Sequence, residues 1–403
     1  MKFMPALSPE MPLEMAIVPC HAALHAVPEP AAQSSPATGT VMAYTEGLRG
    51  YSCEHELMTR LEVVRRLARL KGFQYSAEKP LSADSGPMYY VPSDTLVGID
   101  RATALGIHNR DHLFGGVVPL PFMSTKAITH ALIDEEAKAP DGWSHQFAEL
   151  TGDAVLRGYT AFTQADARRA GLELLQRGPA RVKTVRETGG RGQTVVRDAA
   201  QLDACLAQIP QDSLEADGIV IEENLADVVT LSVGQVTVAG MVVSYYGHQY
   251  LTKNNSGGEA YGGSRLTVVR GDFHALLAGP LPDDSRLAIE QAMVYDSAAM
   301  ACFPGFFASR INYDVAQGID AEGKWRSGVL EQSWRAGGAT GAEIAALEAF
   351  QADPSCEQVT AACVEVYGAC DVPAGAVVYF RGVDSQAGML SKYTVIEPNA
   401  HTS

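Results

Sequence analysis

An apolar strand that carries a lysine and runs into a glycine-rich turn is the first feature with chemistry of its own. The strand covers residues 180–185 and holds Lys183, and the turn leads back to a second apolar run at 193–196 through Gly189, Gly190 and Gly192. Glycine lets backbone N–H groups approach phosphate oxygens closely, and a lysine neutralises phosphate charge. The turn opens no helix, so the segment matches neither the P-loop nor the dinucleotide-binding fingerprint. We expect a polyphosphate-binding hairpin; a glycine-rich hairpin without a ligand is the alternative.

Two adjacent carboxylates end the next apolar strand. Residues 219–221 are Ile-Val-Ile, and Glu222, Glu223, Asn224 and Leu225 follow them. Such a strand end offers carboxylate and backbone acceptors that suit the amino group of adenine and the hydroxyls of a ribose. A solvated sheet edge is the structural alternative.

A third group of polar residues alternates along two apolar segments, 310–315 and 328–335. Side chains alternate between the two faces of a strand. On the first strand Asn312 and Asp314 therefore share one face, and on the second strand Glu331, Ser333 and Arg335 share one face. If the two segments pair as a hairpin, oxygen ligands and an arginine converge on one place. Oxygen ligands of this kind suit Mg²⁺, which takes one or two carboxylates together with substrate phosphates. Alternating charge on an exposed surface remains the other explanation.

The elements that position these residues follow from hydrophobic periodicity. A strand at 40–44, an amphipathic helix at 55–71 and a strand at 88–91 predict a small α/β unit with a parallel sheet. Beyond residue 121 the pattern is α+β, and the fold class is therefore α/β plus α+β. We expect further helices at 124–136, 164–177, 285–300, 340–350 and 357–367. The cysteines at 356, 363 and 370 recur every seven residues, which suggests one face of a helix or of its continuation.

Composition and net charge limit the classes of molecule that this protein can bind. The 403 residues include 31 Lys+Arg and 47 Asp+Glu, a net charge of −16, and 46% of them are hydrophobic. This balance excludes a wholly disordered chain and argues against nucleic acid as a partner, although a local cluster of cations can still bind a small anion. No apolar run reaches the ~18 residues that suggest a membrane span. The sparse cysteines favour a cytoplasmic protein. Residues 20–40 are rich in Ala, Pro and Ser, and we expect residues 1–40 to form a disordered tail.

In this order, the three segments resemble the ATP-grasp superfamily of carboxylate–amine and carboxylate–thiol ligases. Lys183 matches the ATP-binding lysine of that family, and the glycines at 189–192 resemble its mobile phosphate cover. The hinge that holds adenine corresponds to residues 222–225, including Glu222, Glu223 and Leu225. Asp314 and Glu331 look like the metal-bridging carboxylates, and Lys126 is similar in position to a second nucleotide-contacting lysine.

The resemblance implies an ATP- and Mg²⁺-dependent ligase that activates a small-molecule carboxylate as an acyl phosphate for attack by an amine or another nucleophile. Arg335, together with Arg310, would hold the acyl phosphate. The chain departs from the family where Ser333 replaces the usual Asn of an E-x-N pattern, and a hydroxyl binds Mg²⁺ more weakly. Asn312 also rivals Asp314 as the metal ligand. Two alternatives stay open: activation of bicarbonate, as in biotin carboxylase, and a nucleotide-binding module without catalysis.

The resemblance also implies a domain order. Residues 41–120 would form the α/β domain that precedes the ATP-grasp fold, 121–226 its smaller lobe with a connector, and 227–403 its larger lobe with the metal site. Related enzymes are often homodimers, an assembly that one chain does not reveal.

Overall fold

The computed structural model describes residues 39–45, 53–77, 86–187 and 192–397. The predicted tail therefore lies outside the described residues except for Gly39 and Thr40, and so do Gly189 and Gly190. None of the helices in the described ranges has the length and apolarity that a membrane span requires.

The N-terminal part is a parallel three-stranded sheet in the order β2 (Gln74–Ser76), β1 (Thr40–Tyr44) and β3 (Met88–Pro92). Helix α1 (Glu54–Lys71) packs its apolar face against this sheet and ends at Gly72, whose φ of 65° closes the helix in the left-handed region. The predicted parallel α/β unit is thus confirmed. A second small sheet joins β13 (Phe307–Ala308), β5 (Gly116–Val118) and β4 (Leu96–Val97), with α2 (Ile99–Ala104) following β4.

The helix predicted at 124–136 is wrong. The chain instead makes two short 3₁₀ turns, Pro121–Ser124 and Lys126–Thr129. Between them Thr125 is extended, and its hydroxyl oxygen accepts a hydrogen bond from the N–H of Ala127 at 3.2 Å. Threonine side chains compete in this way with helical hydrogen bonds, which apolar spacing alone does not reveal.

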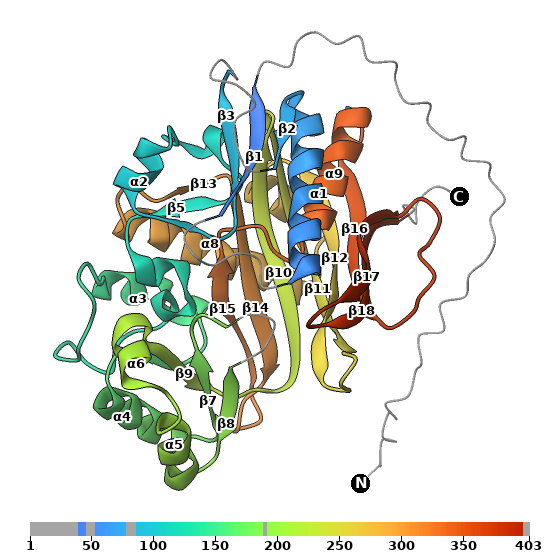
Figure 1. The fold of residues 1–403 in the computed structure, drawn as a ribbon. Helices are drawn as coiled ribbons and strands as arrows, with labels where there is room; N and C mark the ends of the chain where they lie inside the picture. The colour runs from blue at the N-terminus through green and yellow to red at the C-terminus, as the bar shows by residue number, and fades with distance from the viewer. Residues whose placement is uncertain (1–38, 46–52, 78–85, 188–191, 398–403) are drawn as a thin grey trace. The chain divides into compact units, whose positions relative to one another are not determined.

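A four-stranded antiparallel sheet carries the glycine-rich segment, in the order β6 (Gly158–Ala161), β9 (Ile219–Glu223), β7 (Ala180–Thr184) and β8 (Gln193–Val196). Helices α4 (Gln164–Leu175), α5 (Ala199–Leu206) and α6 (Gln211–Asp217) pack on it (Figure 1). Side chains cap two of these helices: Thr163 accepts from the N–H of Asp166, and Asp198 accepts from that of Gln201. Helix α3 (His145–Thr151) precedes β6 and packs on α8 (Asp283–Cys302).

An antiparallel sheet of eight strands forms the C-terminal part. Its strands in spatial order are β15 (Trp325–Ser333), β14 (Arg310–Ile319), β10 (Ala226–Val238), β11 (Met241–Lys253), β12 (Glu259–Arg270), β16 (Gln358–Tyr367), β18 (Gly388–Glu397) and β17 (Val377–Asp384). Helix α8 and the short α7 (Phe273–Ala278) contact this sheet, as does α9 (Thr340–Ala352), which also packs on α1 (Figure 1).

The helix predicted at 357–367 is also wrong, because this segment is strand β16. Val359, Thr360, Val364 and Val366 are β-branched and favour a strand over a helix. The seven-residue spacing of the cysteines therefore reflects no helix face. The fold class nevertheless stands, with a small parallel sheet followed by antiparallel sheets and packed helices.

Candidate functional site

A polar cavity of about 1690 Å³ receives side chains from both antiparallel sheets. Lys183 and Glu222 line it from the four-stranded sheet, and Asp314 and Glu331 line it from the eight-stranded sheet. Both sheets border the cavity, and the fold thereby brings together residues that are far apart in the sequence. The other predicted residues on its wall are Arg310, Asn312, Ser333, Arg335, Glu223 and Leu225.

Lys183 and Glu222 form a buried ion pair between the neighbouring strands β7 and β9. His130 contacts the other carboxylate oxygen of Glu222 through Nε2 at 3.3 Å. Burial opposes ionisation of Glu222, but the charge of Lys183 and the contacts from His130 outweigh it and lower the pKa of this carboxyl to about 2. Glu222 is therefore a carboxylate at neutral pH and holds the ammonium group of Lys183 at the cavity wall.

An apolar wall lies in the same cavity. Leu156, Leu225 and Ala316 form a small buried cluster, and the partly buried Leu330 packs against it. Glu223, the second carboxylate of the strand end, is held by Arg157, whose backbone N–H donates to its Oε1 at 3.1 Å. A flat apolar ring fits such a wall, and the carboxylate of Glu222 lines the same cavity.

Asp314 and Glu331 lie directly opposite each other in the antiparallel pairing of β14 and β15, which confirms the predicted hairpin. Asp314 accepts hydrogen bonds at Oδ1 from the amides of Gln249, at 2.8 Å, and Asn312, at 3.0 Å. Burial and the negative charge of Glu331 raise the pKa of Asp314 to about 6. The carboxylate pair thus carries an electrostatic cost that an added cation would relieve.

Lys126 approaches this pair from the second 3₁₀ turn. Its Nζ lies 2.8 Å from Oε2 of Glu331, and it also donates to the backbone carbonyl of Glu187, at the start of the glycine-rich turn. The side-chain amide of Gln332 donates to the carbonyl of Thr125 at 3.1 Å. This bond ties β15 to the turn and fixes Lys126 beside the carboxylates.

Arg310 is buried, with 1% of its surface exposed. Its guanidinium group pairs with the buried Glu343 of α9 at 2.7 Å and donates to the backbone oxygen of Ser333 at 2.9 Å. Tyr245 connects helix α9 with Asn312 on β14: its hydroxyl lies 2.7 Å from Oε1 of Glu343 and 2.9 Å from Oδ1 of Asn312. These contacts support a positioning role for Arg310.

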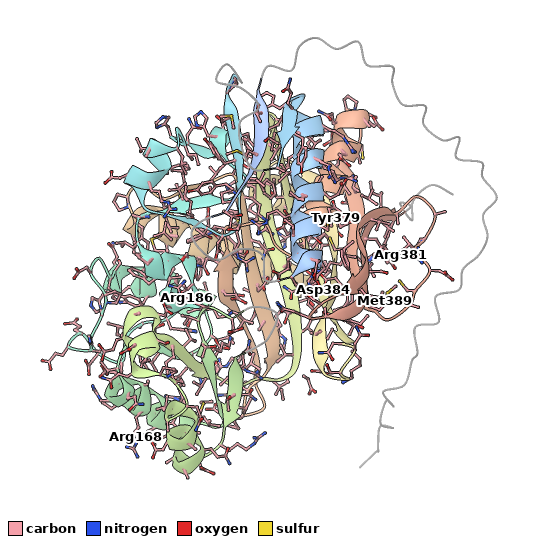
Figure 2. All side chains as sticks on the ribbon, viewed as in Figure 1. Arg168, Arg186, Tyr379, Arg381, Asp384 and Met389 are labelled. Carbon is pink, nitrogen blue, oxygen red and sulfur yellow. The ribbon has the colours of Figure 1, made fainter. Side chains whose placement is uncertain are left out.

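Arg335 reaches the cavity from the end of β15 and is paired with Asp94 at 3.3 Å. Arg186 lines the cavity at the end of β7 and pairs with Asp217 at 2.6 Å (Figure 2). The hydrogen bond that Arg186 donates to Asp217 raises the pKa of Arg186, so this arginine stays charged. Both guanidinium groups are partly exposed and thus accessible to an anion in the cavity.

Several site residues escaped sequence reasoning. His130, Gln249 and Tyr245 belong to no local motif, because each contacts a residue far away in the sequence. Their partners are Glu222, Asp314 and Asn312, in that order. Glu343 left a signal, because it is a lone carboxylate within the small and apolar residues 341–347. Gly192, in the glycine-rich turn, has a φ of +65°, and a Cβ there would lie 2.1 Å from Oγ1 of Thr184, so the backbone requires glycine at this position.

Asp314→Asn is expected to stabilise the metal-free chain above pH 6. The folded pKa of about 6 lies above the ordinary 3.8, so the carboxylate is less favourable in the folded chain than in the unfolded one. The gain should shrink as the pH falls through 6, because the folded wild-type side chain then takes up its proton. Urea unfolding in the presence of a chelator, across this pH range, measures the difference.

Asp320→Asn is the matched control on the same hairpin. Hydrogen bonds from the backbone N–H of Lys324 and from Arg326 lower the pKa of Asp320, so this substitution should destabilise the chain at neutral pH. Equal effects of the two substitutions would contradict the assigned repulsion between Asp314 and Glu331.

Solved structures of several enzymes are similar to this chain. Biotin carboxylase from Campylobacter jejuni, in complex with β-γ-ATP, has 10% identity and a TM-score of 0.49, over 90% of this chain and 88% of the other. N5-carboxyaminoimidazole synthetase from Staphylococcus aureus with ADP has 13% identity and a TM-score of 0.48, over 90% and 95%. Phosphoribosylamine–glycine ligase from Thermotoga maritima has 15% identity and a TM-score of 0.46, over 88% and 91%. No curated protein matches the chain.

Fold and site together define a mixed α/β protein in which two antiparallel sheets supply Lys183 and the carboxylates Glu222, Asp314 and Glu331 to one cavity. The chain belongs to the family described as "Protein of unknown function (DUF3182)", whose model matches residues 43–394.

Proposed function

We propose that this protein is an ATP- and Mg²⁺-dependent ligase that activates a carboxylate as an acyl phosphate for attack by an amine or another nucleophile. The observation that carries the proposal is the direct pairing of Asp314 with Glu331 in a cavity that also holds the buried Lys183, with Lys126 on Glu331. Two carboxylates and two lysines suit a nucleotide polyphosphate with its metal ion. The resemblance to ATP-grasp ligases, noted from the sequence, agrees with this reading.

The donor set fits Mg²⁺. Asp314 and Glu331 offer hard carboxylate oxygens, and the partners of Asp314 among the described residues are the neutral amides of Gln249 and Asn312. Burial and the charge of Glu331 raise the pKa of Asp314, and a bound cation would favour the charged form of this carboxyl. Bound Mg²⁺ would supply positive charge for the phosphoryl oxygens. The Ser333 hydroxyl lies 3.3 Å from Nη1 of Arg310, so Ser333 is the weakest member of the set.

The lining also fits an adenine nucleotide. Leu156, Leu225 and Leu330 offer apolar contact to a base, and Glu222 lies on the same lining as an acceptor for its amino group. Lys183 would neutralise the phosphates, with Lys126 beside the metal carboxylates. Arg335 would hold the activated acid, and Arg310 would keep the backbone of Ser333 and the end of β15 in place.

Cation placement is the main catalytic contribution of these residues. Charge that develops on a transferring phosphoryl group is stabilised by cations fixed before the reaction, which costs no reorganisation at that moment. Glu222 fixes Lys183 and Glu331 fixes Lys126. The acid and the nucleophile would enter from the part of the cavity beside Arg335 and Asp94.

The test is calorimetry with ATP and Mg²⁺, followed by ADP release across a library of carboxylic acids and amines. We expect binding of ATP and ADP release that needs both an acid and a nucleophile. Release that depends on bicarbonate would favour the carboxylase-like alternative. Binding without turnover on any substrate would favour a nucleotide-binding module, and a lack of ATP binding would refute the proposal.

Lys183→Met should weaken ATP binding by about 10- to 100-fold, because a hydrogen bond from a charged donor is worth about 1.5–3 kcal/mol. Calorimetric titration with ATP and Mg²⁺ measures the change. Lys138→Met is the control, since Lys138 and its partner Glu215 are both more than 40% exposed on the surface. A Lys183 variant that remains folded and binds ATP as the wild type does would remove Lys183 from the site.

A further inference from the structure

The first turn of α1 brings together three different metal-ligating groups. Cys53 precedes the helix, and His55 and Glu56 lie in its first turn. One ligand atom from each of them lies within 4.8 Å of the others. All three residues line the large cavity, yet none belongs to the carboxylate pair or to the lysines that the proposed ligase uses.

The turn between β17 and β18 holds this group in place. Asp384 accepts the backbone N–H of His55 at 3.0 Å, and its other oxygen accepts the N–H groups of Gln386 and Ala387 at 2.8 Å (Figure 2). Glu54 in turn accepts the N–H of Ser385 at 3.0 Å. Contacts at Glu54 and at the N–H of His55 therefore fix the backbone at the start of α1, from which His55 and Glu56 extend.

His55 provides a second, independent observation. Its Nδ1 atom is buried and has no hydrogen-bond partner in the described part of the chain. Most buried polar atoms have a partner, so this atom is available to a ligand. A metal ion bound at a ring nitrogen, with the proton shifted to the other nitrogen, would use this atom.

The three donors identify the kind of ion. We propose that Cys53, His55 and Glu56 form a binding site for a divalent transition metal of the Zn²⁺ type, with a coordination position open to the cavity. Zn²⁺ binds sulfur at about 2.3 Å and nitrogen or oxygen at about 2.0–2.2 Å, so its ligands are about 3.3–3.8 Å apart. Small side-chain rotations bring atoms that lie within 4.8 Å into this range. Mg²⁺ and Ca²⁺ prefer oxygen ligands alone.

The surrounding charges favour a cation. Glu54, Glu56 and Asp384 all act electrostatically on His55, against the cation Lys392. The amide end of a helix opposes a nearby cation, but it also stabilises a thiolate, the form of Cys53 that binds metal. Three protein ligands leave a further position for water or a substrate, as in catalytic zinc sites. The inference goes beyond the proposed function and needs no ligase activity.

The test is a titration of the metal-free full chain with Co²⁺, which reports a thiolate ligand through its charge-transfer absorption. We expect one equivalent to bind with this absorption, and Zn²⁺ to displace it. Cys53→Ser should abolish the absorption. His55→Ala should weaken binding by more than about 10-fold, since even the loss of an outer-shell partner costs about 10- to 100-fold.

Cys370→Ser and His112→Ala are matched controls, because neither residue belongs to the group; both should leave the titration unchanged. Circular dichroism verifies that each variant is folded, and Glu56→Gln tests the third ligand with a side chain of the same shape. Binding without the thiolate absorption, an absorption that persists in Cys53→Ser, or no stoichiometric binding would each overturn the proposal. Failure of the ligase proposal would leave these readouts unaffected, because none of them needs ATP.

Discussion

Glu331→Gln is expected to lower substrate-stimulated ADP release by at least about 10³-fold, because removal of one preorganised electrostatic contact to a transition state already costs about 10²- to 10³-fold and the loss of a metal ligand adds to it. The substitution removes a proposed metal ligand and the partner of Lys126 at once. It should not unfold the chain, since the Glu331 side chain is 29% exposed and its charge repels Asp314. Steady-state ADP release at saturating ATP and Mg²⁺ measures the effect.

The control for this substitution is Glu322→Gln in the turn of the same hairpin. Glu322 is exposed and pairs with the exposed Lys324, so its loss should leave the rate as it is. Thermal unfolding of both variants separates lost catalysis from lost structure. An unchanged rate in Glu331→Gln would contradict the assignment of the metal site to β14 and β15.

Glu343→Gln should reduce the free energy of unfolding by about 3–5 kcal/mol, the usual cost of removing one partner from a buried ion pair. Glu343 is fully buried in α9 and accepts hydrogen bonds from Arg310 and Tyr245. The neutral amide would leave the charge of Arg310 buried without its counter-ion. Because Arg310 also holds the backbone of Ser333, the rate of ADP release should fall as well.

Urea unfolding measures this loss, with two comparisons. Tyr245→Phe removes a single hydroxyl from the same network and should cost about 1 kcal/mol. Glu62→Gln breaks the partly exposed pair with Arg65, 3.2 Å apart, and should cost less than about 1 kcal/mol. If Glu343→Gln cost no more than Glu62→Gln, the network would not be what holds β14 and β15 to α9.

The carboxylate pair could be predicted because its signal is local. Asn312 and Asp314 lie two residues apart, as do Glu331 and Ser333, and two consecutive strands joined by a polar turn pair as a hairpin. The predicted hairpin is confirmed, and its register, which the sequence did not predict, places Asp314 opposite Glu331. The same local logic gave β7 and β8 around the glycine-rich turn.

Contacts between distant segments could not be predicted in this way. The bond from Gln332 to the carbonyl of Thr125 and the buried pair of Arg310 with Glu343 join elements far apart in the sequence. Apolar spacing predicts a helix at Lys126, but Lys126 lies in a 3₁₀ turn. The hydrogen bond between the Thr125 hydroxyl and the N–H of Ala127, and the bond from Gln332 of β15, stabilise this turn. In β16 the β-branched residues outweighed a periodicity that small alanines and cysteines made ambiguous.

The sequence departs at Ser333 from the E-x-N pattern of the ATP-grasp superfamily, which it resembles, and this departure concerns a proposed metal ligand. Ser333 holds the position of an expected Asn, and its hydroxyl lies near Arg310. Asn312 lies directly opposite it on β14, with its amide toward Asp314 and its oxygen toward Tyr245. We therefore assign the main metal ligands of the proposed site to Asp314 and Glu331 and a positioning role to Asn312.

In the proposed reaction, the protein transfers the γ-phosphoryl group of ATP to a carboxylate. The most direct test uses a carboxylic acid that stimulates ADP release, labelled with ¹⁸O in its carboxyl group. We expect that one labelled oxygen appears in the inorganic phosphate for each ADP formed, and that Glu331→Gln abolishes this transfer. Phosphate that forms without the label would contradict the proposed reaction, because its oxygen would then come from water and the protein would act as a hydrolase.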